Sequence, residues 1–209
     1  MTNRTQRPTP AVRLPRPQRR EQLLDVTKRI VGESGLHAVS IDRVAREAGI
    51  SRPIIYEHFS DLGGLLISLL DREGQRALNQ LTAVMPGEPT DGPVVDVLLA
   101  TLTGYLQAVQ SDSVTWRLVL MPPEGAPEFL HERIEQGRAA VIAQLAKLIE
   151  NAFEPGGAQQ SPDPELTAHS MSALSDHWAR LMLTDPEHFD LDRILVHARW
   201  ALANFVPAD

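Results

Sequence analysis

The stretch SIDRVAREAGISRPIIYEHF, residues 40–59, constrains the fold of this chain more than any other. It holds two short apolar-periodic runs separated by Gly49, Ile50 and Ser51. Two short helices joined by a glycine-containing turn of three or four residues form a helix-turn-helix. We therefore predict one helix after Ser40, which is a good N-cap, and a second from Ser51 to about Phe59.

A proline inside the second run is compatible with this prediction. With Ser51 as the N-cap, Pro53 falls in the first helical turn, where its missing N–H breaks no hydrogen bond. In this motif the second helix enters the major groove, and its N-terminal residues reach base edges. Pro53 then offers a small apolar surface to a thymine methyl group, and Arg52 is placed for a guanine edge or a phosphate.

Residues 18–65 resemble the DNA-binding head of tetracycline-repressor (TetR) family regulators. The match rests on Gly35, Ser40–Ile41, VAREAGIS (44–51), IYEHF (55–59) and Leu65. Two features depart from the family pattern: Leu62 stands where a lysine is usual, and Pro53–Ile54 replaces a common Gly-Thr pair. With the phosphate contact that the resemblance implies for Ser40, the predicted DNA-binding residues are Ser40, Arg46, Ser51, Arg52, Pro53, Ile54, Tyr56 and His58.

Apolar residues recur at helical spacing along most of the chain, and no alternating β-branched run is present. We predict helices at about 18–34, 41–48, 52–59, 62–84, 94–110, 113–121, 126–153, 165–184 and 187–206. The predicted fold is all-α, with a three-helix DNA-binding head and a larger helical body, about nine helices in total. The expected domains are a disordered basic arm (1–17), a helix-turn-helix domain (18–62) and a ligand-binding and dimerisation domain (63–209).

Charge is divided unevenly along the chain. Residues 1–60 hold eleven basic and six acidic residues, whereas residues 61–209 hold nine basic and twenty-one acidic residues, within a net charge of −7. A basic head on an acidic body indicates that only the head meets a polyanion. The arginine-rich and proline-rich arm could track DNA phosphates or be an inert tail.

The resemblance implies that the body dimerises and senses a small molecule. Large apolar residues with a few polar groups suit a ligand cavity, and our candidates for its lining are Tyr105, Trp116, Arg117, Met121 and Trp178. Small residues mixed with leucines on the last two helices suit a four-helix interface. The candidates for that dimer interface are Ala173, Leu174, Leu181, Leu195, Ala198 and Leu202. Ordinary core packing is the alternative for both sets.

Several functional classes are not supported by the sequence. The chain has no cysteine and no apolar run long enough to span a membrane, so we expect a cytoplasmic protein. His169 and His177 are too far apart to share an ion, no catalytic motif is present, and we expect neither a metal, a cofactor nor an enzyme. The expected partners are a palindromic DNA operator, a small-molecule effector and a second copy of the chain. A helical ligand- or protein-binding module, with a purely structural helix-turn-helix, is the alternative.

Overall fold

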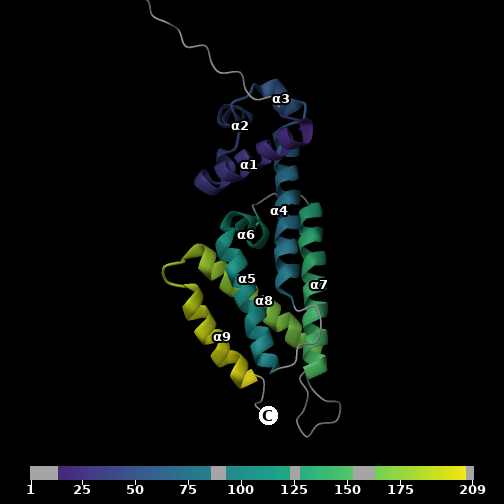
Figure 1. Ribbon diagram of the computed structural model, residues 1–209, viewed down its shortest axis with the longest axis vertical. Helices are drawn as coiled ribbons and strands as arrows, with labels where there is room; N and C mark the ends of the chain where they lie inside the picture. Colours follow the sequence, from purple (N-terminus) through teal and green to yellow (C-terminus); the bar gives the residue numbers. More distant parts are fainter. Residues whose placement is uncertain (1–13, 86–92, 123–127, 153–162, 206–209) are drawn as a thin grey trace, which may run out of the picture. The chain divides into compact units, whose positions relative to one another are not determined.

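The structure is a computed structural model that describes residues 14–85, 93–122, 128–152 and 163–205. Within these ranges the chain forms nine α-helices, one short 3-10 helix and no strand (Figure 1). The predicted all-α class is therefore confirmed. In the described residues, no helix combines the length and apolarity that crossing a bilayer requires.

The chain divides into two compact units, Met1–Leu70 and Asp71–Asp209. The described part of the first unit holds α1 (Arg16–Ser34), the 3-10 helix η1 (Leu36–Ala38), α2 (Ile41–Ala48), α3 (Arg52–Tyr56) and the start of α4 (Leu62–Val84). The division lies eight residues beyond the expected boundary after Leu62, because the first turns of α4 contribute buried side chains, Leu65 and Leu69, to the first unit.

Two glycines set the turns of the first unit. Gly35 ends α1 with φ 80°, and Gly49 ends α2 with φ 67° and ψ 34° in the left-handed region. A side chain on Gly49 would meet no atom within 4 Å, so the backbone angle, and not space, requires glycine there. At the other end of α2, the Ser40 hydroxyl accepts the Arg43 amide at 3.2 Å, which is the predicted N-cap.

Several helix ends differ from the sequence expectation by one to four residues. Arg16 opens α1 two residues early, because Pro17 falls in the first turn, where proline is tolerated. Regular α3 stops at Tyr56 and not at Phe59, because the amides of His58 and Phe59 both bond to the Ile55 carbonyl. The last helix starts at Leu191 and not near residue 187.

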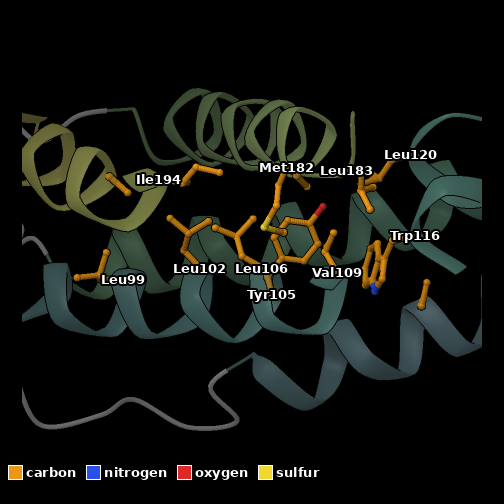
Figure 2. Close-up of a cluster of buried hydrophobic side chains, with 13 residues drawn as sticks. Leu99, Leu102, Tyr105, Leu106, Val109, Trp116, Leu120, Met182, Leu183 and Ile194 are labelled. Carbon is orange, nitrogen blue, oxygen red and sulfur yellow. The ribbon is translucent and has the colours of Figure 1, made fainter. Parts of the chain in front are cut away.

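The second unit contains the rest of α4, α5 (Val94–Ser111), α6 (Ser113–Leu120), α7 (Glu128–Ala152), α8 (Pro164–Thr184) and α9 (Leu191–Phe205). Helix α5 packs against α6, α7, α8 and α9, and α7 packs along α8. Figure 2 shows the core that forms around α5, where Leu102, Leu106 and Val109 meet Met182 of α8 and Ile194 of α9. A second apolar cluster joins α5, α7 and α8. The body is thus built around α5.

Candidate nucleic-acid interface and body cavity

Helix α3 has one exposed side and one buried side. Ile55 is 0% exposed and Phe59, just beyond the helix, is 4% exposed, so both pack inward as predicted. Arg52 and Pro53 are exposed, and Tyr56 is 52% exposed. The remaining predicted DNA-binding residues divide into exposed side chains, Ser40, Arg46 and Ser51, and half-buried ones, Ile54 and His58. The structure therefore leaves most of the predicted set accessible to a macromolecule.

Two arginines of α1 hold the end of α3. The Arg16 guanidinium donates to the Glu57 carbonyl at 3.0 Å, and the Arg20 guanidinium lies 4.6 Å from the centre of the Phe59 ring. Arg20 also donates to the Ser68 hydroxyl of α4 at 3.0 Å. The sequence assigned Arg16 to the arm, whereas the structure gives it this capping contact. The rest of the arm, residues 1–13, lies outside the described residues.

Ion pairs tie the helices of the motif together. Arg43 of α2 bonds to Glu47 at 2.8 Å and to the Ser34 hydroxyl of α1 at 3.1 Å. Arg52 pairs with Asp42 across the helix-turn-helix, and both side chains are more than 60% exposed. An exposed pair of this kind contributes little to stability, so Arg52 can exchange Asp42 for a phosphate or a base edge at low cost.

His58 and Asp61 follow α3 along the chain. Burial lowers the pKa of His58, and the nearby Arg16 charge lowers it further, so the imidazole is neutral at pH 7. Asp61 lies just before α4, and its carboxylate accepts the Gly64 amide at 2.7 Å. The carboxylate therefore occupies a position at the start of α4 where helix amides could bind a phosphate, and sequence reasoning did not identify it.

The body contains a cavity of about 520 Å³, a size typical of small-molecule sites. Its wall is mostly apolar and includes Tyr105, Trp116 and Trp178, three of the five predicted residues. Arg117 and Met121 are not among the lining residues. The exposed Arg117 guanidinium donates to the Leu183 carbonyl at the end of α8, and Met121 is 36% exposed at the end of α6. Helical periodicity explains the difference, because positions one and five residues after Trp116, those of Arg117 and Met121, lie off the side of the helix that Trp116 occupies.

A polar cluster lies at one place in the cavity wall. The Tyr105 hydroxyl donates to one Asp176 oxygen at 3.0 Å, and Arg138 donates to the other at 2.7 Å. Burial and the adjacent Asp176 carboxylate raise the pKa of Tyr105 well above its ordinary value, so the phenol stays protonated and donates. Sequence reasoning missed Arg138 here, because its partner Asp176 lies on another helix, α8, 38 residues away.

Two consecutive residues of α6 bond to α4. The Trp116 indole, which lines the cavity, donates to Gln80 at 2.8 Å, and its ring meets the Tyr105 ring edge-on at 5.1 Å. Thr115 donates from its hydroxyl to the fully buried Glu73, which is also paired with Arg72 at 2.8 Å. The cavity wall is thus connected by hydrogen bonds to α4.

The predicted interface residues fall into two groups. Ala173 and Leu174 of α8 are exposed, and Leu181 is half-buried. On α9, Ala198 is 0% exposed, and Leu195 and Leu202 pack on the core of the same chain but stay partly exposed. The assignment of these residues to an interface remains a prediction. Among the described side chains of α9, the large apolar ones that are exposed are Val196 (73%) and Trp200 (63%). The sequence marked the apolar side of α9, which the chain itself covers in part.

In the described ranges, no group of three or more His, Asp or Glu side chains is arranged to hold an ion. His169 and His177 of α8 are both exposed.

Comparisons with known proteins agree with this arrangement. Residues 23–69 match the model of the bacterial regulatory proteins of the tetR family. The transcriptional activator FasR of Mycolicibacterium smegmatis is 32% identical over 205 residues, covering 93% of this chain and 87% of FasR. A TetR-like regulator from Rhodococcus sp. RHA1 superimposes with a TM-score of 0.66 at 24% identity, covering 90% of this chain and 97% of that one.

A further structural relative is the regulator FadR of Bacillus subtilis, solved in complex with stearoyl-CoA. It gives a TM-score of 0.65 at 14% identity and covers 90% of this chain and 99% of its own. That level of identity shows a shared fold. Because FasR matches nearly the whole chain and the family model matches the helix-turn-helix, this chain belongs to the TetR family and is a DNA-binding transcriptional regulator, not an enzyme.

Proposed function

We propose that this regulator binds a palindromic operator as a homodimer and releases it when a small molecule fills the body cavity. The observation that carries the proposal is the two-sided α3, which buries Ile55 and leaves Arg52, Pro53 and Tyr56 exposed. A helix-turn-helix of this kind places such side chains against base edges and phosphates. A protein of this class acts on chromosomal DNA, and the proposal therefore places it in the cytoplasm.

The size of the head and the exposed side of the last two helices support the proposed dimer. A single short recognition helix reads few base pairs, and a two-fold dimer doubles the contact on a palindrome. Val196 and Trp200 of α9 and Leu174 of α8 are exposed apolar side chains on these helices. We assign this surface, together with Ala173, to the contact with a second copy.

The cavity supports the effector part of the proposal. Its apolar wall and its few polar groups, Tyr105, Arg138 and Asp176, are the composition of a small-molecule site. Trp116 connects that wall to Gln80 on α4, and the same helix starts in the head. A ligand that moves Trp116 would therefore bias α4 between two arrangements, with a coupling free energy of about 1–3 kcal/mol if typical.

Selection of bound sequences from random DNA tests the proposal. We expect a two-fold symmetric site whose half-site centres lie about one or more helical turns apart. Recovery of unrelated sequences, or of a single asymmetric half-site, would contradict the dimer on a palindrome. A reporter gene placed behind the recovered site then distinguishes a repressor from an activator, the output that the name of FasR states for that relative.

A further inference from the structure

A second hollow adjoins the apolar cavity on α7 and α8. Both are lined by Arg138, Ser172 and Asp176. The second hollow has a more polar wall than the apolar cavity, and its other charged residues are Glu135, Glu165 and Arg180. The ion pair between Arg138 and Asp176 therefore separates the apolar cavity from a polar recess.

Few charged groups line the apolar cavity. Among its described lining residues, Arg138 is the one basic side chain, and Asp163 and Asp176 are the acidic ones. Asp163 caps α8 by accepting the Leu166 amide at 3.0 Å. The ion pair between Arg138 and Asp176 therefore determines how the affinity of the cavity depends on the charge of a ligand.

The two members of this pair differ in their freedom to move. Asp176 has a short side chain that is 16% exposed, and Tyr105 holds one of its oxygens. Arg138 has a long side chain that is 36% exposed, and it also bonds to Glu135 on its own helix at 3.1 Å. Arg138 can thus turn into the polar recess and keep a carboxylate partner, whereas Asp176 stays in the cavity wall.

We propose that the effector is a lipophilic cation, an amine or quaternary ammonium on an apolar body, whose charge replaces Arg138 on Asp176. This inference rests on the proposed role of the cavity as the effector site. The aromatic rings of Tyr105, Trp116 and Trp178 line the same space and favour a cation over an anion. The acidic body, with nine basic and twenty-one acidic residues in 61–209, attracts cations as well.

An anionic amphiphile should bind less favourably than a cation. It would take Arg138 from Asp176 and leave a mostly buried carboxylate without its cation, which is strongly unfavourable. A neutral ligand leaves the pair intact and gains only from the apolar wall. A comparison of the affinities of amphiphiles that differ only in charge therefore tests the inference.

The test uses decylamine, decanol and decanoate as probes of one chain length, titrated into the full-length protein below their micelle concentrations. Quenching of tryptophan fluorescence and titration calorimetry report binding. We expect decylamine to bind at least about ten-fold more tightly than decanol, and decanoate to bind more weakly than decanol. Asp176→Asn should remove the preference for the amine over decanol. Glu150→Gln, which removes an exposed carboxylate of α7, is the matched control.

A second variant predicts a change of the opposite sign. Arg138→Gln removes the internal competitor for Asp176, so we expect decylamine to bind several-fold more tightly than to the wild type. Equal affinities for decylamine and decanol, or tighter binding of decanoate that Arg138→Gln abolishes, would overturn the inference and leave the cavity as an effector site. Failure of all three probes to bind would instead contradict the cavity's proposed role, and the inference with it.

Discussion

Thr115 of α6 donates its hydroxyl hydrogen to the carboxylate of Glu73 on α4, and both side chains are 0% exposed. A buried carboxylate depends on each of its donors, because only hydrogen bonds and ion pairs with them offset the free-energy cost of its desolvation. Arg72 and Arg76 supply the positive charges at 2.8 Å and 3.6 Å, and Thr115 supplies the contact from another helix.

Loss of that contact should lower stability. We expect Thr115→Val, which keeps the shape but removes the hydroxyl, to lower the free energy of unfolding by about 1–3 kcal/mol. Thr115→Ser keeps the donor and should retain more of the stability. Urea denaturation of the three proteins checks the order. A valine variant as stable as the wild type would show that Glu73 does not depend on Thr115.

The bond between Trp116 and Gln80 should carry the effect of a cavity ligand to α4. We expect Gln80→Leu to keep probe affinity and to reduce the probe's effect on operator affinity, which is about 5-fold to 150-fold in typical allosteric proteins. Operator titrations with and without saturating decylamine measure this coupling. Gln75→Leu is the matched control, because Gln75 bonds along its own helix, to Asn79 at 3.0 Å. Equal coupling in both variants would exclude this route.

How much of this site the sequence could predict depends on the distance along the chain between the partners. Gly49 and Pro53 act within one turn, so their roles follow from backbone rules and were predicted. The cluster of Tyr105, Arg138 and Asp176 joins three helices, and no local pattern indicates which polar side chains will meet. Tertiary packing alone brings them together.

Helix α9 shows that sequence periodicity also cannot assign a helix surface to the core or to an interface. Periodicity correctly marked Leu195, Ala198 and Leu202 as one apolar side, but an apolar side does not reveal whether the same chain or a second copy covers it. The structure packs all three on the core of the same chain, completely for Ala198 and only partly for Leu195 and Leu202. The exposed Val196 and Trp200 break the amphipathic pattern, and that irregularity was the available signal.

Val196 provides a test of the dimer surface. We expect Val196→Asp to raise the dimer dissociation constant by at least about a hundred-fold, because a two-fold interface carries the buried charge twice. Sedimentation equilibrium measures the change. Ala140→Asp, on an exposed position of α7, is the matched control and should remain dimeric. A Val196→Asp protein that dimerises like the control would move the interface elsewhere.

His58 should make stability depend on pH. Its folded pKa lies below the unfolded value near 6.5, because burial and the Arg16 charge disfavour the imidazolium. The unfolded chain therefore binds more protons in this window, and stability falls as pH drops from about 6.5 through the lowered folded pKa. His58→Asn should remove this component. Denaturation of both proteins from neutral to mildly acidic pH checks the difference, which should grow toward low pH; parallel curves would refute the assignment.

Titration of the selected operator with wild type, Arg52→Ala and Lys147→Ala tests the central claim most directly. Arg52 lies at the exposed start of α3, whereas Lys147 is an exposed charge on α7. We predict that Arg52→Ala weakens specific binding by about 1–3 kcal/mol and relaxes the preference for operator over random DNA. Lys147→Ala should bind like the wild type. Unchanged operator affinity in Arg52→Ala, or an equal loss in both variants, would contradict the account of α3 as the helix that reads DNA.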